Sequence, residues 1–267
     1  MTSLFLFAAA LFTQDISWQP ATPPQGSLIV VSAPGAITGD VAGEPLHFTG
    51  GKALAAVPLG ATDSTRIVTL SIRWDGAVVG KAAYVPVRPR KAPVNEQVRA
   101  AERFTPPPDS ALLARIDRER DLMGDAARRA HELPRLWKAP FVRPRTSRIT
   151  SVFGSGRQVN GVWRSRHAGL DLAGPKGAPV RVSNRGIVAL VGDFFYGGIS
   201  VFVHHGDGVM TVYFHLSRAL VAVGDTVERG QIIGRVGATG RVTGPHLHWG
   251  AQYGNVAFNP VDLLKLR

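Results

Sequence analysis

The residues Ile199-Ser200-Val201-Phe202-Val203-His204-His205 run directly into Gly206-Asp207-Gly208. The first segment is rich in β-branched and aromatic residues, which favours a strand, and Gly-Asp-Gly is typical of a hairpin turn. If the strand is regular, His204 and His205 point to opposite faces, so only one of them can face a core. We expect His205 to be a structural residue that supports its neighbours rather than a catalytic one.

The same character extends on both sides of this strand. From residue 180 to residue 256 the sequence contains short strand-like runs separated by glycine turns, with no convincing long helix. This composition predicts an antiparallel β architecture. We expect residues 155–166 and 194–198 to be loops that form the walls of a groove on one sheet, a shape that suits an elongated peptide.

The N-terminal part, from residue 17 to about residue 89, also favours strands. Residues 27–31, 65–74 and 80–87 are alternating or β-branched runs separated by Gly, Pro and Asp turns, which predicts a small antiparallel sandwich. Residues 53–58 are ambiguous, because alanine favours neither strand nor loop. Trp74-Asp75-Gly76 is typical of a hairpin corner.

A linker and a helix are predicted between these two parts. Residues 88–93 have the composition of a linker, and Thr105-Pro106-Pro107-Pro108 is a second, rigid break. Asp109 can then cap a helix that ends at Pro134. Its apolar positions keep a helical spacing that is typical of a packed face: Leu112, Leu113, Ile116, Met123 and Ala127. We expect this helix to pack on one of the two domains, with Trp137 and Phe141 as anchors.

The chain is therefore predicted to be mainly β and to have four parts. They are a signal-peptide-like segment (1–15), a small β-sandwich (16–90), a linker with a helix (91–142) and an antiparallel β domain (143–267). Residues 4–12 form an apolar run that fits a signal-peptide core and is too short to span a bilayer. No Lys or Arg precedes Lys52, so the usual positive start is missing. We still expect a cleavable signal and export without an anchor.

Composition excludes several kinds of chemistry. The 267-residue chain contains no cysteine, so thiol catalysis and thiolate metal ligands are ruled out. The formal net charge is +12, which raises the question of a nucleic-acid partner. The positive residues are spread along the chain, however, without an aromatic-interleaved basic motif or a helix-turn-helix pattern. We therefore expect no nucleic acid to bind.

Most of the chemical information lies in five residues: His167, Asp171, His215, His246 and His248. Imidazole and carboxylate without thiolate suit zinc or another borderline divalent metal. In an extended strand His246 and His248 project from the same side and can reach one ion, although spacing alone does not say which of them binds it. His167 and Asp171 are separated by Gly169, so a turn into a short strand is expected rather than a helix.

Six short segments surround these residues between about residue 148 and residue 260. They are Ser151-Val152-Phe153-Gly154, His167-x-x-x-Asp171, Pro175-Lys176-Gly177-Ala178-Pro179-Val180, Tyr213-x-His215-Leu216-Ser217, Gly230-Gln231-x-Ile233-Gly234 and Thr243-Gly244-Pro245-His246-Leu247-His248. In this order they resemble the lysostaphin-type zinc metallopeptidases, the LytM-domain family of peptidoglycan endopeptidases. The resemblance covers a little under half of the chain and makes residues 143–267 a metallopeptidase domain.

The resemblance implies a role for each of the five residues. His167, Asp171 and His248 would hold one zinc ion per chain, whereas His215 and His246 would stand beside it and handle protons or the developing oxyanion. Three protein ligands leave a position for water, whose pKa zinc lowers toward about 7. The sequence has no H-E-x-x-H helix, so a histidine must replace the glutamate base of thermolysin-like enzymes.

The implied substrates are stem or cross-link peptides of bacterial cell-wall peptidoglycan. This places the protein in the periplasm or cell envelope. Cell-wall polymers carry carboxylates and often phosphates, so a cationic hydrolase would be attracted to them by peripheral, salt-sensitive contact.

Three other functions are compatible with parts of the sequence. A noncatalytic LytM-like regulator or binding module would normally have lost metal ligands, and here every position is filled. An iron oxygenase with two histidines and one carboxylate uses the same ligand types, but the flanking motifs argue against it. Residues 223–234 resemble the strand-turn pattern of biotinyl and lipoyl carriers, yet no lysine sits on a hairpin tip.

Two further expectations concern residues outside the candidate site. His47 and His131 have no ligand partners nearby in the sequence, and we assign them to surface or helix-packing roles. The modular layout also permits the sandwich or its linker to cover the groove.

Overall fold

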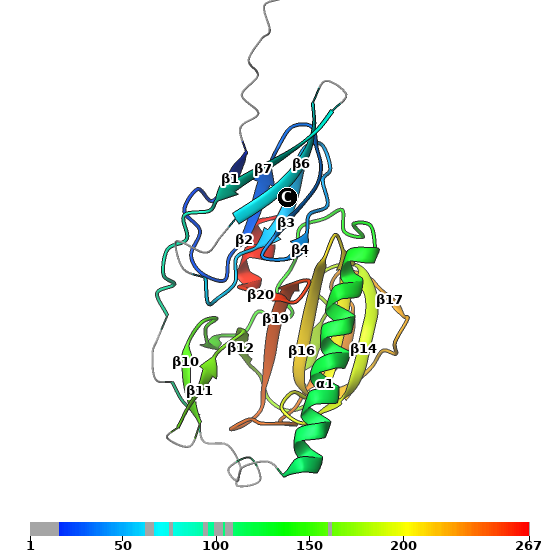
Figure 1. The fold of residues 1–267 in the computed structure, drawn as a ribbon. Helices are drawn as coiled ribbons and strands as arrows, with labels where there is room; N and C mark the ends of the chain where they lie inside the picture. Colours follow the sequence, from blue (N-terminus) through cyan, green and yellow to red (C-terminus); the bar gives the residue numbers. More distant parts are fainter. Residues whose placement is uncertain are drawn as a thin grey trace, which may run out of the picture.

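The structure is a computed structural model, and it describes residues 16–61, 67–74, 77–92, 96–98, 104, 109–159 and 162–266. The described residues are mainly strands, which confirms the predicted fold class (Figure 1). Three predicted features lie outside these residues: the signal-like segment 1–15, the corner at Asp75-Gly76 and the proline break at 105–108.

The N-terminal part consists of two small antiparallel sheets. The first has the strand order β1-β2-β5, with bounds Ser17–Gln19, Leu28–Ser32 and Lys52–Ala56. The second has the order β4-β3-β6-β7, with bounds Glu44–Pro45, Ala36–Val41, Ile67–Trp74 and Ala77–Tyr84. A core that includes Ile29, Val31, Val41 and Val57 lies between them.

The first small sheet is buried on both faces. In β5 the side chains of Ala53 and Ala55 belong to the core of the N-terminal part, whereas those of Leu54 and Ala56 belong to the main core of the C-terminal part. Successive side chains of a strand point to opposite faces, so this alternation follows from β geometry. Small residues allow close packing on both sides, which explains why the alanine-rich stretch forms a strand.

The C-terminal part is built on a ten-stranded sheet in which every pair is antiparallel. Its main path runs β17-β14-β15-β16-β19-β12-β9, with bounds Thr226–Val227, Gly186–Phe194, Gly198–Gly206, Val209–Ala219, His246–Tyr253, Gly169–Ala173 and Ile149–Ser151. Three further strands flank this path: β13 (Pro179–Arg181), β18 (Ile232–Val236) and β20 (Val256–Phe258). The prediction of an antiparallel β domain is confirmed.

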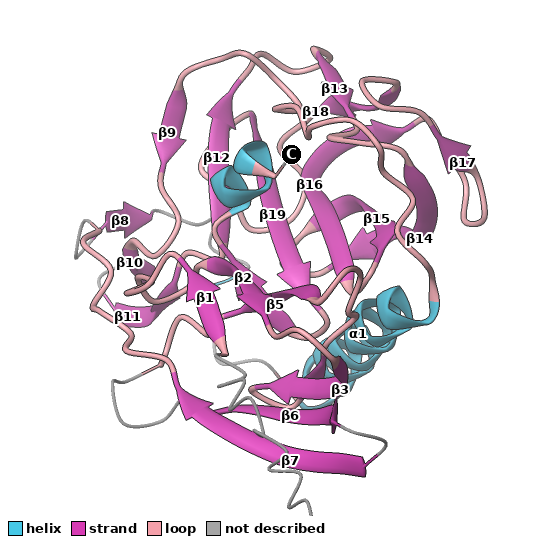
Figure 2. Ribbon diagram, turned by 90° about the horizontal axis from the view of Figure 1, so that it is seen from above, coloured by secondary structure: helices cyan, strands magenta, loops and turns pink. Residues whose placement is uncertain are grey.

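One of the two expected loops is largely a strand pair. Residues 155–166 contain β10 (Gly156–Val159) and β11 (Val162–Arg166), which pair antiparallel. A short linker strand, β8 (Glu96–Val98), joins β10 in parallel (Figure 2). The loop prediction was wrong here because β10 and β11 pair with each other, and the distant β8 adds a further partner to β10. Residues 194–198 do form a short connection between β14 and β15.

The helix α1 (Ser110–Arg129) begins where predicted, because the Asp109 carboxylate accepts a hydrogen bond from the Leu112 amide at 2.8 Å. It lies along β14 and β16 (Figure 1) and buries Ala126 and Ala127 against the sheet. A 3-10 helix, η2 (Ala130–Glu132), continues it, and a second, η3 (Pro260–Lys265), follows β20. Leu113 is 47% exposed, so its assignment to the packed face was wrong.

The contacts of α1 with the sheet explain why Leu113 is exposed. The buried residues of α1 are alanines near its C-terminal end, and they pack on Phe202, Met210 and Val212. The predicted anchors Trp137 and Phe141 are both buried, and their rings are 5.4 Å apart. Within the described residues, no helix has the length and apolar character needed to cross a membrane.

The two adjacent histidines of β15 are both buried, so the expectation that only one faces a core was wrong. His204 lies under α1 and donates from Nε2 to the Ala126 carbonyl at 2.5 Å. His205 lies on the other face, where its Nδ1 donates to the Arg185 carbonyl at 2.8 Å and its Nε2 lies 2.8 Å from the Thr211 hydroxyl. Burial lowers the pKa of His205 to about 4, so the ring is neutral and structural.

His47 and His131 contact each other, although the sequence suggested independent roles. Their rings stack at 5.1 Å, and His47 Nε2 lies 2.9 Å from His131 Nδ1. The other nitrogen of His131 lies 3.1 Å from the carboxylate of Glu44. His131 belongs to η2 and the other two residues to the N-terminal part, so this hydrogen-bonded row connects the two parts.

The N-cap gives a direct test of how α1 begins. Replacing Asp109 by alanine removes the acceptor for the Leu112 amide and should cost about 1 kcal/mol of unfolding free energy. For a chain of this size, a melting temperature lower by roughly 2–4 °C is expected in calorimetry. Asp117→Ala is the matched control, because Asp117 is an exposed residue of the same helix whose carboxylate pairs with the equally exposed Arg120. Equal losses in the two variants would contradict the capping role.

Candidate metal centre and its groove

The centre of the candidate site is the pairing of β12 with β19. In this antiparallel pair Asp171 lies directly opposite His248, and Ala173 lies opposite His246. Directly opposite side chains on one face are close neighbours, so the strand register itself brings the carboxylate to the imidazoles. His167 lies in the turn just before β12, as the glycine at position 169 predicted.

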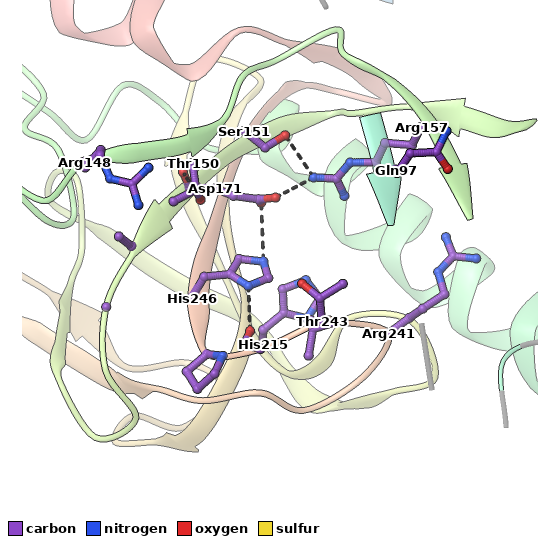
Figure 3. A pocket seen from close by; sticks show the side chains of 15 residues that line it. Gln97, Arg148, Thr150, Ser151, Arg157, Asp171, His215, Arg241, Thr243 and His246 are labelled. Atoms are coloured by element: carbon purple, nitrogen blue, oxygen red, sulfur yellow. Dashed lines mark hydrogen bonds and ion pairs between the residues drawn. The ribbon is translucent and has the colours of Figure 1, made fainter. Parts of the chain in front are cut away.

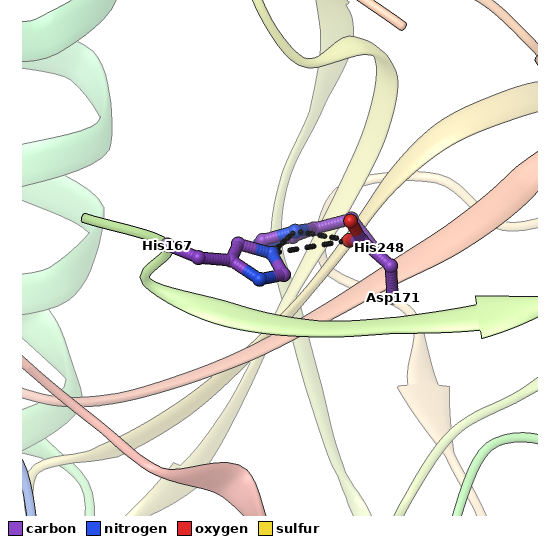
Figure 4. Close-up of side chains that lie close together, drawn as sticks. All are labelled: His167, Asp171 and His248. Atoms are coloured by element: carbon purple, nitrogen blue, oxygen red, sulfur yellow. Dashed lines mark hydrogen bonds and ion pairs between the residues drawn. The ribbon is translucent and has the colours of Figure 1, made fainter. Parts of the chain in front are cut away.

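Three atoms of these side chains form a compact triangle (Figure 4). His167 Nε2 lies 2.9 Å from His248 Nδ1 and 3.1 Å from Asp171 Oδ1, and the third side, from His248 Nδ1 to Asp171 Oδ1, is 3.0 Å. Tetrahedral ligands about 2.0 Å from a zinc ion lie roughly 3.3 Å apart, so the triangle is close to the size of one face of such a site. The donor set and its geometry therefore fit a divalent metal ion.

The triangle is held from behind by hydrogen bonds. His167 Nδ1 lies 3.1 Å from the Val152 carbonyl and 2.9 Å from the Ser151 hydroxyl, so its proton sits on Nδ1 and Nε2 is left as a ligand. The Arg157 guanidinium donates to Oδ2 of Asp171. The other carboxylate oxygen, Oδ1, thus faces the two imidazoles. The orientation of His167 and Asp171 is therefore fixed before any ion binds.

Burial sets the protonation states that metal binding requires. All three residues of the triangle are buried. Burial is the largest cause that lowers the pKa of His248 to about 4, so its ring is neutral near pH 7. For Asp171 burial alone would raise the pKa, but the contacts of its carboxylate with His167 and His248 outweigh burial and lower the pKa. A neutral imidazole and an ionised carboxylate are the states that bind a cation.

His215 and His246 lie beside the triangle, and their ring centroids are 4.9 Å apart. His215 occupies an irregular point of β16 with a φ of 64°, which turns its side chain out of the regular sheet. Its Nδ1 donates to the Thr239 carbonyl at 3.0 Å, so Nε2 is the basic atom. Burial, then the neighbouring His248 and His246, hold the pKa of His215 well below its usual value.

His246 is the more exposed member of the pair. Its Nδ1 donates to the Gly244 carbonyl at 2.9 Å, and its Nε2 lies 3.6 Å from Asp171 Oδ1. The structure therefore brings all five residues singled out in the sequence to one place. Two rings are in position to exchange protons with a group bound beside the triangle.

A groove of about 400 Å³ opens onto Asp171, His215 and His246 (Figure 3). Its walls come from separate parts of the chain, namely β9, the β10–β11 hairpin and residues 241–245. Gln97 of the linker strand β8 also lines it, so the linker reaches the groove as one expectation allowed. The sandwich itself contributes no residue to the described lining.

Sequence reasoning missed several residues of the site. Arg157, which holds the carboxylate of Asp171, lies in the segment expected to be a loop, and nothing in its neighbourhood marks it as a partner. The role of Thr239 rests on its backbone carbonyl, which any residue type would supply. Arg148 and Arg241 line the groove from opposite sides, but each is one of many arginines in a basic chain.

Imidazoles and a carboxylate that converge in an open groove are what a metal-dependent hydrolase requires, and they define the class of this domain. Comparison with known families agrees with that class. Residues 165–260 match Peptidase family M23, so the chain carries an M23 peptidase domain.

Individual relatives extend this match. The chain is 42% identical over 118 residues to the DD-carboxypeptidase/endopeptidase Mpg of Neisseria meningitidis serogroup B, which covers 44% of this chain and 27% of Mpg. It is 38% identical over 157 residues to the peptidoglycan DD-endopeptidase ShyB of Vibrio cholerae, which covers 58% of this chain and 35% of ShyB. The chain thus spans about a quarter to a third of these relatives.

One solved structure covers nearly the whole molecule. It is a crystal structure of a protein from Pseudomonas aeruginosa described as a peptidase M23, with 27% sequence identity and a TM-score of 0.67. The likeness covers 92% of this chain and 95% of that one. The N-terminal sheets and the helix are therefore part of the shared architecture.

The close approach of β12 and β19 can be tested by a substitution that replaces none of the three candidate metal ligands. A Cβ at Gly169 would lie 2.6 Å from His248 Nε2 and 2.7 Å from the Trp249 carbonyl. Gly169→Ala should therefore displace His248 and weaken metal binding by roughly tenfold or more, as disturbances of supporting groups do. Competition with a chelator of known affinity measures the change.

Gly60→Ala serves as the control for this substitution, because a Cβ at Gly60 meets nothing within 4 Å. It should leave metal affinity unchanged. An unchanged affinity in Gly169→Ala would show that the strand spacing does not govern the site.

Proposed function

We propose that this protein is a zinc-dependent endopeptidase that hydrolyses peptide bonds in bacterial peptidoglycan. The single observation that carries the proposal is the triangle of His167 Nε2, Asp171 Oδ1 and His248 Nδ1, whose Asp171 corner lines a groove that also presents His215 and His246. The name of the relative ShyB, a peptidoglycan DD-endopeptidase, supports the substrate class. Stem or cross-link peptides would occupy the groove.

The choice of zinc rests on the donor set. Two imidazoles and one carboxylate without thiolate suit this ion, and three protein ligands leave a position open, as catalytic zinc sites do. When bound, zinc would polarise the scissile carbonyl and acidify a water molecule. His167, Asp171 and His248 would hold one ion per chain.

The chain's own residues would then manage the protons. His215 is buried and neutral, and its Nδ1 is engaged by the Thr239 carbonyl, so Nε2 can accept a proton from the attacking water. His246 is fixed through Nδ1 and presents Nε2 toward the triangle. As an imidazolium, with a second proton on Nε2, it would donate a hydrogen bond to the developing oxyanion or that proton to the leaving amine. Arg157 would keep the Asp171 carboxylate oriented.

We also propose export to the periplasm or cell envelope, where such a substrate lies. The apolar run at residues 4–12 supports this, and so does the net charge of +12, which favours peripheral contact with an anionic cell wall.

Two substitutions separate ligand roles from proton-transfer roles. His248→Ala should remove both bound zinc and turnover, because the triangle loses one corner. His215→Ala should keep about one zinc per chain while kcat falls roughly 100-fold or more, because only the base is lost. Metal analysis and peptide hydrolysis are measured on the same samples. Near-normal digestion by either variant contradicts these roles.

A direct assay tests the function itself. Purified sacculi are incubated with the full chain, and mass spectrometry of the released muropeptides identifies the cleaved bond. We expect peptide-bond products that disappear with chelator and return when zinc is added. Binding to sacculi without any cleavage, at full zinc occupancy, would instead support the noncatalytic regulator.

A further inference from the structure

The groove carries an excess of positive charge that metal binding does not explain. Three arginines line it, Arg148, Arg157 and Arg241, whereas Asp171 is the one carboxylate among its described lining residues. That carboxylate is already engaged by two imidazoles and by Arg157. A cation bound at the triangle would make the groove more positive still. The groove is therefore suited to a substrate that brings negative charge.

The guanidinium of Arg157 donates to Asp171, whereas Arg148 and Arg241 lie on the two sides of the groove. Figure 3 shows Arg148 and Arg241 on opposite sides of the groove, with His246 and His215 between them. A peptide laid across the catalytic residues would pass one arginine on each side of the bond to be cut.

Both arginines are anchored by their backbones. The carbonyl of Arg148 accepts a hydrogen bond from the Ala173 amide at 2.9 Å, which fixes it beside the end of β12. The amide of Arg241 donates to the Tyr196 carbonyl at 2.9 Å, and its guanidinium lies 4.3 Å from the centre of the Tyr196 ring. Stacking on an aromatic ring limits the positions that a guanidinium samples and reduces the entropy lost on binding.

We propose that Arg148 and Arg241 are specificity-determining residues that bind carboxylates of the substrate on the two sides of the scissile bond. This inference rests on the proposed peptidase function and narrows its substrate class to peptides with free acidic groups near the cleaved bond. A guanidinium forms paired hydrogen bonds with a carboxylate that an amide cannot match, since the amide lacks the charge and one acceptor oxygen. Amidation of those carboxylates should therefore lower binding.

The test compares two synthetic cross-linked peptides that are identical except that the carboxylates flanking the scissile bond are free in one and amidated in the other. For the wild-type chain loaded with zinc, kcat/KM should be roughly tenfold or more higher for the acid form. Arg148→Gln and Arg241→Gln should each reduce this preference by raising KM for the acid form. Zinc content and kcat should remain near wild type.

Two further variants test whether the preference for the acid form depends on these two guanidinium groups. Arg185→Gln removes a cation that pairs with Glu228 on the surface, and it should preserve the preference. Arg241→Lys keeps the charge without the planar fork and should give an intermediate preference. Equal kcat/KM for the acid and amide peptides in wild type, or an unchanged ratio in both glutamine variants, overturns the proposal.

Calorimetric binding of the same peptides to the full chain, with zinc removed, separates this inference from the proposed function. Tighter binding of the acid form that is lost in the glutamine variants supports the arginine sites even if neither peptide is cut. Cleavage of both peptides at one rate supports the peptidase and refutes the arginine sites. Inorganic phosphate is the third probe, and displacement of the acid peptide by phosphate at equal concentration would show a general anion site and refute carboxylate recognition.

Discussion

The register of β12 against β19 is the constraint on which the rest of the site depends. It sets Asp171 opposite His248, and it places His246, two residues before His248, on the same face of the sheet. A shift of one residue would turn the carboxylate and both imidazoles to the other side of the sheet, because side chains alternate strictly. Gly169 allows the two strands to come close enough for the ligand atoms to meet, and the turn before it brings in His167. A metal-sized triangle thus follows from backbone pairing.

The elements outside this strand pair hold it in place and define its surroundings. The helix α1 covers one face of the large sheet with alanines, which explains why Phe202 of β15 and Met210 and Val212 of β16 are buried there. The β10–β11 hairpin carries Arg157 to the carboxylate, and residues near 240 supply the carbonyl that fixes His215. Hydrogen bonds with other segments therefore orient three of these side chains: His167 through residues 151 and 152, Asp171 through Arg157, and His215 through Thr239. This division is typical of sites that are organised before their ligand arrives.

Local patterns in the sequence predicted the features that depend on local geometry. Strand alternation placed His246 and His248 on one face, the glycine at 169 predicted a turn into a strand, and Asp109 marked the start of the helix. The errors have a different origin. Both histidines of β15 are buried because a separate helix covers the second face, and no period-two pattern contains that information. The β10–β11 segment forms two strands that pair with each other, and β10 also pairs with β8, some 60 residues earlier in the chain. Arg157 lies in β10, and its contact with Asp171 joins two segments that no local pattern links.

The small sheet β1-β2-β5 has a consequence for how this molecule can evolve. In β5 alternate residues belong to two different hydrophobic cores, one in each part of the protein. Insertion or deletion of a single residue would exchange the two sets and place each side chain in the wrong core. Surface loops tolerate such length changes, but this strand cannot. We therefore expect β5 to constrain the evolution of both parts at once, even though the candidate site lies in only one of them.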